Sequence, residues 1–134
     1  MNRRKRTFLV IGPALALGLL ATGAASAREE IAAPPEALKA LVRMVEAVKA
    51  ESYDAFLVDA DANLKTHLSR QQFEGVCGLY AQQLKKGYTL DYFGHLKQRG
   101  YLVHVWKITA TGAQDDALIK LALKDGKVGG VWIF

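Results

Sequence analysis

The sequence predicts an α+β domain in which three N-terminal helices pack on a curved four-stranded antiparallel sheet, preceded by a signal peptide. Apolar residues recur at intervals of three and four between residues 35 and 86, which is typical of amphipathic helices. From residue 88 onward the apolar period changes to two, which indicates half-buried strands. Helices followed by a run of strands are typical of the α+β class.

The first 27 residues have the pattern of an export signal. Basic residues at positions 3–6 precede an uncharged apolar run, Phe8–Leu20, and residues 25–27 are the small residues that a signal peptidase accepts. We therefore expect a signal peptide at 1–27, a linker at 28–34 and one domain at 35–134. The domain would work in the periplasm or outside the cell, without membrane contact after cleavage. The alternative is that residues 7–27 stay in the bilayer as an anchor, although Pro13 weakens such a helix.

Charge and cysteine content exclude several classes of protein. Four of the 18 lysines and arginines lie in the predicted signal, so the remaining 14 nearly balance the 13 acids and leave no nucleic-acid footprint. Cys77 is the only cysteine, which excludes an intramolecular disulfide, and its place on an apolar helical stripe indicates a small buried residue. The three histidines and the cysteine lack the spacing of metal ligands. We expect neither a metal nor a cofactor.

A first helix is expected from Pro35 to Ala50. Proline is accepted in a first helical turn, and apolar residues follow at helical spacing, namely Leu38, Leu41, Val42, Val45 and Val48. Ser52 predicts the cap of a short second helix that turns Tyr53 and Phe56 inward. We interpret residues 59–67 as a loop.

The third helix has the clearest local signal. Ser69 and Gln72 have the spacing of a capping box. Apolar residues then follow at intervals of three and four, namely Phe73, Val76, Cys77, Tyr80, Ala81 and Leu84. Gly87 stands where a residue in the left-handed conformation ends a helix.

Four strands are expected after this helix, at residues 88–97, Tyr101–Ala110, Ala117–Leu123 and Val128–Phe134. Asp125 and Gly126 are the pair favoured in a two-residue hairpin turn, and the pair Gly129-Gly130 indicates a bulge or sharp bend. Alternation along the strands places one face toward the helices. Its residues are Leu90, Tyr92, Leu96, Leu102, His104, Trp106, Ile108, Ile119, Leu121 and Leu123.

This order of elements resembles the NTF2-like superfamily, whose cone-shaped, cystatin-like domains wrap helices against a strongly curved sheet. Three stretches carry the resemblance, namely residues 50–56, residues 64–69 running into Phe73, and the closing hairpin Ala117–Val131. The resemblance covers nearly all of the chain after the signal and is closest to small exported bacterial domains of unassigned function. The superfamily includes isomerases, cyclases, dehydratases, ligand binders and assembly modules, so fold alone does not choose among them. Steroid-isomerase members use paired acids, and none of the inward positions carries a carboxylate.

His104 is the ionisable residue expected to face the interior. With Tyr92 on the neighbouring strand it would form a polar spot in an apolar pocket, where burial keeps the imidazole neutral, as a general base requires. The alternatives are a core histidine satisfied by one hydrogen bond, or a histidine that faces solvent because the inward face is the opposite one. His67 and His95 are expected to be ordinary exposed residues. Aromatic rings at core spacing would line the pocket or fill the core, namely Tyr53, Tyr80, Tyr92 and Trp106.

These residues support three hypotheses about function. The first is an exported non-enzymatic domain that binds a small apolar ligand, or a segment of a partner protein, in the cone. The second is an isomerase, cyclase or dehydratase with His104 as base and Tyr92 as orienting donor. The third is a homodimeric or inhibitor-like module that pairs through the sheet. It rests on Trp132 and Phe134, which share one face of the last strand and form an apolar patch if that face is the outer one. If that face is the inner one, they close the wide end of the cone.

Overall fold

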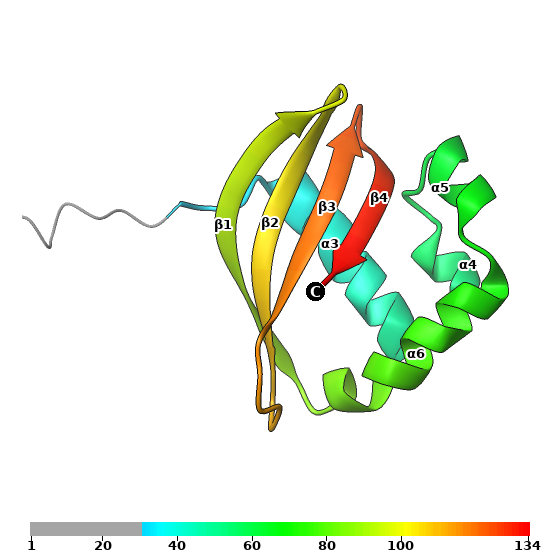
Figure 1. Ribbon diagram of the computed structural model, residues 1–134, viewed down its shortest axis with the longest axis vertical. Helices are drawn as coiled ribbons and strands as arrows, with labels where there is room; N and C mark the ends of the chain where they lie inside the picture. Colours follow the sequence, from blue (N-terminus) through cyan, green and yellow to red (C-terminus); the bar gives the residue numbers. More distant parts are fainter. Residues whose placement is uncertain (1–30) are drawn as a thin grey trace, which may run out of the picture. The chain divides into compact units, whose positions relative to one another are not determined.

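Helices precede strands along the chain, as the sequence predicts. The structure is a computed structural model that describes residues 31–134, so the predicted signal peptide lies outside the described residues. The helices are α3 (Pro35–Lys49), α4 (Tyr53–Phe56), α5 (Ala62–His67) and α6 (Arg70–Lys85). The strands are β1 (Tyr88–Gln98), β2 (Tyr101–Ala110), β3 (Ala117–Lys124) and β4 (Lys127–Ile133). The α+β class is confirmed (Figure 1).

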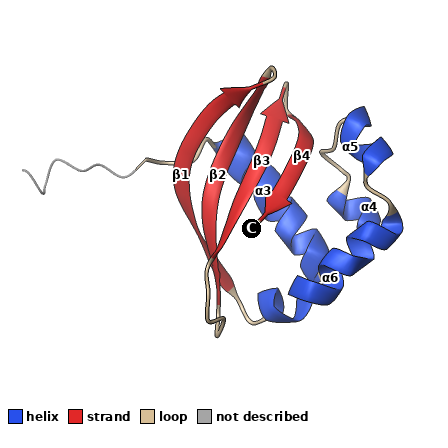
Figure 2. Cartoon of the chain, viewed as in Figure 1, coloured by secondary structure: helices blue, strands red, loops and turns tan. Residues whose placement is uncertain are grey.

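The strands form one antiparallel meander in the order β1-β2-β3-β4, so β1 and β4 are the two edges of the sheet. The register pairs Tyr92 with Trp106 and His104 with Leu121. Paired residues point to the same side of a sheet, so these four residues share one face, which we call the inner face. The strands bend together, and α3 lies across one side of them (Figures 1 and 2).

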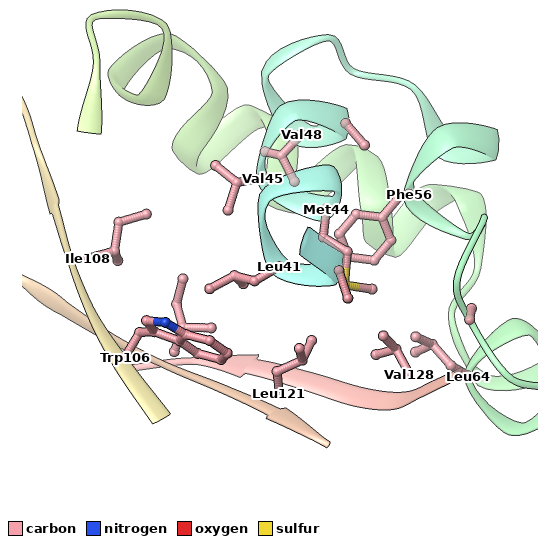
Figure 3. Close-up of a cluster of buried hydrophobic side chains, with 14 of the residues drawn as sticks. Leu41, Met44, Val45, Val48, Phe56, Leu64, Trp106, Ile108, Leu121 and Val128 are labelled. Atoms are coloured by element: carbon pink, nitrogen blue, oxygen red, sulfur yellow. The ribbon is translucent and has the colours of Figure 1, made fainter. Parts of the chain in front are cut away.

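Helix α3 supplies the centre of the core. Pro35 stands in its first turn, and one side of the helix is buried along its whole length, from Ala37 to Val48. Small residues near its start and larger ones further on meet the inner face of the sheet. Figure 3 shows Leu41 pointing toward Trp106 and Leu121, which are each at most 1% exposed. Burial of this face is the main source of stability for a helix of this length.

The prediction of a loop at residues 59–67 is wrong from residue 62 onward, where the structure has α5. Asp61 caps this helix by accepting a hydrogen bond from the amide of Leu64 at 2.8 Å, and Leu64 is buried. A helix of six residues spans less than two turns, which is too short to show a helical period in the sequence. The described chain therefore has a fourth, short helix in addition to the three that were predicted.

Asp61 also ties this region to the sheet. Its amide donates to the carbonyl oxygen of Val128 in β4 at 2.8 Å, and its carboxylate accepts from the hydroxyl of Tyr101 at 2.9 Å. The amide of Val128 donates in turn to the carbonyl oxygen of Asp59 at 2.7 Å. Residues 59–61 thus form a short parallel bridge along the edge of β4 that points away from β3.

The capping box of α6 is confirmed. The hydroxyl of Ser69 accepts from the amide of Gln72 at 3.1 Å, and the side chain of Gln72 accepts from the amide of Ser69 at 2.9 Å. The helix turns Phe73, Cys77 and Ala81 toward α3 and buries them. Within residues 31–134, no helix combines the length and the apolar character needed to cross a membrane.

A β-bulge in β1 corrects the predicted inner face. The register shifts between Tyr92 and Gly94, and Gly94 has a φ of 123°, a conformation that favours glycine. One extra residue reverses the faces of all residues that follow. Leu96, predicted to point inward, is therefore 45% exposed on the other face, and His95 takes the inner position opposite His104.

The glycine pair in β4 also lies at a register shift, as the sequence predicts. The ring of Tyr101 lies over Gly129 and the ring of Trp132 lies over Gly130, so close that a Cβ at either position would collide with it. These glycines therefore have two effects. They bend the strand, and they let two aromatic rings lie flat on the outer face of the sheet.

Candidate ligand cavity

An apolar cavity of about 420 Å³ lies between the helices and one end of the sheet. Leu41, Val45 and Val48 form its wall on α3, and Val76 and Tyr80 form its wall on α6. The opposite wall is the inner face of the sheet, with Ile108, Ile119 and Val131. Figure 3 shows how Val45 and Val48 on α3 stand opposite Ile108 across the interior. A volume above about 300 Å³ with an apolar lining is typical of small-molecule sites.

Small residues explain why side chains do not fill this space. Ala110 ends β2, Ala117 begins β3, and Ala113 lies in the connection between them, and all three line the cavity. An alanine contributes only a methyl group, which is too short to fill the space between this end of the sheet and the helices. Larger residues such as Trp106 fill the same interior further along β2.

The cavity reaches the surface beside α6 and β4. Leu79 lines it and is 74% exposed, and Ile133 lines it from β4 and is 36% exposed. The polar groups of its rim come mainly from Gln83 and Asp115. The side-chain amide of Gln83 donates to the carbonyl oxygen of Thr111 at 2.5 Å, which ties α6 to the loop between β2 and β3. A bound molecule would therefore have an apolar body and a polar contact near this loop.

The residues predicted to bind a ligand divide into two groups. Tyr80 lines the cavity, whereas Tyr53, Tyr92, His104 and Trp106 are not among its lining residues. Tyr53 packs on Phe73, with ring centroids 5.7 Å apart, and its hydroxyl donates to the carbonyl oxygen of Leu68 at 2.6 Å. Tyr53 therefore links α4 to the segment between α5 and α6 and to α6 itself.

Tyr92, His104 and Trp106 form a second cluster beyond the cavity, together with His95. The hydroxyl of Tyr92 lies 2.9 Å from Nδ1 of His104 and 3.4 Å from Nδ1 of His95. The two imidazole centroids are 5.5 Å apart, and Trp106 packs against both Tyr92 and His104. Because the phenol has one hydrogen, it donates to one imidazole and accepts from the other.

The electrostatics of this cluster favour neutral groups. Burial lowers the pKa of His104 and the neighbouring His95 lowers it further, while the carboxylate of Glu36 in α3 acts in the opposite direction. Burial also raises the pKa of the Tyr92 hydroxyl. His104 is 2% exposed, so its imidazole has the neutral form of a base but lies away from the cavity and from solvent. Catalysis by His104 and Tyr92 stays a prediction of the sequence.

His95 is exposed, as expected from the sequence, but it also contacts this cluster, which was not predicted. Simple alternation puts it on the face opposite Tyr92, and the bulge at Gly94 brings it back. The one available signal was a glycine in the middle of a strand pattern, which often marks a bulge.

Trp132 and Phe134 lie on the outer face of the sheet. The register places Val131 and Ile133 inward, opposite Leu121 and Ile119, so the residues between and after them point outward. Trp132 is 47% exposed and Phe134 is 68% exposed. The Lys120 ammonium lies 5.7 Å from the ring centroid of Trp132 and 5.1 Å from that of Phe134, within reach of a cation–π contact.

Residues 31–134 bring no three His, Cys, Asp or Glu side chains together in a way that could hold a metal ion. His67 is exposed on α5, where its Nδ1 lies 2.8 Å from the carbonyl oxygen of Asn63 one turn earlier.

No protein-family model matches the chain, and no curated protein matches it. Solved structures do match. TerC, co-crystallised with polyporic acid, is 11% identical over 74% of this chain and 90% of its own length, with a TM-score of 0.43. An uncharacterized cystatin-fold protein from Novosphingobium aromaticivorans is 11% identical over 72% of this chain and 96% of its own length, with a TM-score of 0.39. A cystatin-like α+β fold is what the resemblance to the NTF2-like superfamily implies.

Proposed function

We propose that this chain is an exported, non-enzymatic domain that binds an apolar molecule or an apolar segment in the cavity between α3, α6 and the sheet. The observation that carries the proposal is the cavity itself, about 420 Å³ of apolar space that reaches the surface beside Leu79. Export rests on the signal-like pattern of residues 1–27.

An apolar occupant is favoured by the hydrophobic effect. Leu41, Val45 and Ile108 present hydrocarbon to the cavity, and burying it against a ligand contributes roughly 25 cal/mol per Å² of apolar area removed from water. Gln83 and Asp115 give the same occupant polar contacts at one end. A non-enzymatic role is favoured because His104 lies outside the cavity lining and is buried behind Trp106, so it has no access to a cavity-bound substrate.

The dye N-phenyl-1-naphthylamine, whose emission rises in apolar surroundings, tests the proposal directly. We expect saturable binding to the purified protein and a Val76→Phe variant that binds roughly tenfold or more weakly, a loss of about 1.4 kcal/mol. Val76 lines the cavity on α6, so a phenyl ring there occupies the space of the dye.

Val58→Phe is the matched control, because Val58 is 57% exposed and does not line the cavity. It should bind the dye as the parent does. If Val76→Phe unfolds, Ala113→Phe in the β2–β3 connection fills the same cavity from a loop. Dye binding that both cavity variants leave unchanged, with their circular dichroism intact, would reject the proposal.

A second candidate function is association through the outer face of the sheet. The exposed rings of Trp132 and Phe134 with Lys120 between them are the observation that favours it. Aromatic residues of this kind are enriched at protein interfaces.

A further inference from the structure

Strand β4 has an outer edge that the rest of the described chain covers only in part. Leu118 and Phe134 exchange both of their backbone hydrogen bonds, at 3.0 and 2.9 Å. In an antiparallel ladder such pairs alternate, so Trp132 bonds to Lys120 in the same way. The amides and carbonyls of Val131 and Ile133 therefore point away from β3, toward the free edge. None of residues 31–134 is recorded as bonding to these groups from outside the sheet.

The chain itself shows how this edge can be covered. At Val128, one step earlier along the same edge, residues 59–61 pair with β4 as a short parallel bridge. Proteins usually protect a free edge with charged residues, proline or a bulge. The segment Val131-Trp132-Ile133 has none of these, and the bulge at Gly129 lies before it.

The ligand cavity lies directly beside this free edge. Val131 and Ile133 line it from β4, and Val76 and Leu79 line it from α6. Side chains alternate along a strand, so every second residue of a strand added to the edge would point inward with Val131 and Ile133. Those side chains would enter the cavity.

One unpaired charge stands at the rim. Asp115 lines the cavity, and within residues 31–134 no ion pair or side-chain hydrogen bond is recorded for it. Its neighbour Asp116, by contrast, accepts from Thr109 at 2.7 Å and pairs with Lys107 at 3.7 Å. A cationic group at the end of the occupant would complement Asp115.

We propose that the occupant of the cavity is an extended segment of another polypeptide. It adds to β4 as a fifth strand, with alternate apolar side chains in the cavity and a lysine or arginine beside Asp115. This inference rests on the proposed function and names its partner. A polypeptide matches both the free edge of β4 and the apolar cavity beside it. Its backbone supplies donors and acceptors for Val131 and Ile133 at the spacing of a strand, and its side chains supply the apolar groups.

Selection of random octapeptides displayed on phage against the purified protein tests the partner. We expect the enriched sequences to alternate apolar and polar residues and to carry a basic residue at one end. Hydrogen exchange then locates a synthetic peptide of the enriched sequence. In the free protein the amides of Val131 and Ile133 should exchange quickly and that of Trp132 slowly, and the peptide should slow the first two by roughly tenfold or more.

Two variants at one position separate strand pairing from apolar contact. Ile133→Pro removes an amide that β3 does not use, which an edge strand tolerates. It should abolish peptide binding, whereas Ile133→Ala, which keeps the amide, should weaken it only several-fold. Circular dichroism like that of the parent would show that both variants fold. Asp115→Asn should weaken the peptide by several-fold and remove the basic residue from the selected consensus.

Each contrary outcome has one meaning. Dye binding without enrichment of any alternating peptide, or peptides that leave the exchange at Val131 and Ile133 unchanged, would overturn the strand proposal and leave a small molecule as the occupant. Slow exchange at both amides in the free protein, together with a dimer in light scattering, would make a second copy of the chain the occupant and would also overturn it. Failure of both dye and peptide to bind would reject the proposed function itself.

Discussion

His104 is the one buried polar or charged side chain among residues 31–134, and it links the stability of the fold to pH. Its partners are Tyr92 and His95 on β1, with the charge of Glu36 on α3 nearby. Burial lowers the pKa of this imidazole in the folded protein below the ordinary value of 6.5. The unfolded chain therefore binds the proton first as the pH falls.

We expect the free energy of unfolding to be constant near neutral pH and to decrease as the pH falls below about 6.5, until the folded imidazole itself is protonated. Urea unfolding measured between pH 7.5 and 5 would show this. In His104→Gln, which keeps a polar group beside Tyr92 but does not titrate, the decrease should become smaller. His67→Gln, at the exposed histidine of α5, is the control and should retain the decrease. Equal slopes in the parent and His104→Gln would contradict the prediction.

At the same scale, the sequence predicted contacts on regular strands well and failed where a single residue was inserted. The side-by-side placement of Tyr92 and His104 follows from alternation and is present, with a 2.9 Å hydrogen bond. The position of His95 depends on the bulge at Gly94, whose effect is to reverse every later residue of β1. A glycine in a strand suggests a bulge but does not specify it, so the error could not be avoided from alternation alone.

Helix α6 begins at a capping box that should contribute measurably to stability. Ser69→Ala removes the hydroxyl that accepts from the amide of Gln72 at 3.1 Å and leaves that amide without its cap. We expect a loss of about 1 kcal/mol in the free energy of unfolding. The thermal midpoint should fall by several degrees in calorimetry. Gln71→Ala, at an exposed position in the same turn, should change the free energy by less than about 0.5 kcal/mol. A Ser69→Ala midpoint equal to that of the parent would show that the cap is not needed.

Among the elements, those marked by a pair of signalling residues were predicted correctly. The capping box marked the start of α6, and Asp125-Gly126 marked the hairpin between β3 and β4. Helix α5 was missed because its only sequence signal is the cap at Asp61, and its stability comes from contacts that are distant in the chain, such as the pairing of Asp61 with Val128.

At the scale of the whole molecule, the outer face of the sheet makes a prediction about association. If Trp132 and Phe134 pair two copies, light scattering on the purified protein should show a dimer. Trp132→Lys should convert it to a monomer, because a second ammonium beside Lys120 repels and the apolar contact is lost. Val58→Lys changes an exposed apolar residue in the connection before α5, outside the pair Trp132 and Phe134, and should stay dimeric. A parent protein that is monomeric at all concentrations would exclude the homodimer.

The layered arrangement of the molecule and an apolar pocket were predictable, but the position of the cavity and its lining were not. The order of helices and strands and the change of apolar period predicted helices packed on an antiparallel sheet, and the resemblance to the NTF2-like superfamily implied that the sheet is curved. The cavity depends on distances between layers and on Ala110, Ala113 and Ala117, whose small size leaves a gap only in three dimensions. Four aromatic residues were predicted to line the pocket, namely Tyr53, Tyr80, Tyr92 and Trp106, and of these four only Tyr80 lines the cavity.

The bridge between residues 59–61 and Val128 limits where an added strand can pair with β4. Residues 59–61 already bond to the outward-facing backbone groups of Val128. An added strand therefore cannot shift toward the β3–β4 hairpin and must pair with β4 beyond this bridge. Backbone hydrogen bonds alone allow an added strand to shift by two residues, because the pattern repeats at that interval. The bridge at Val128 prevents such a shift. Asp61 would thus set the register of the added strand on β4. Its carboxylate is held in place by Tyr101 and the first turn of α5.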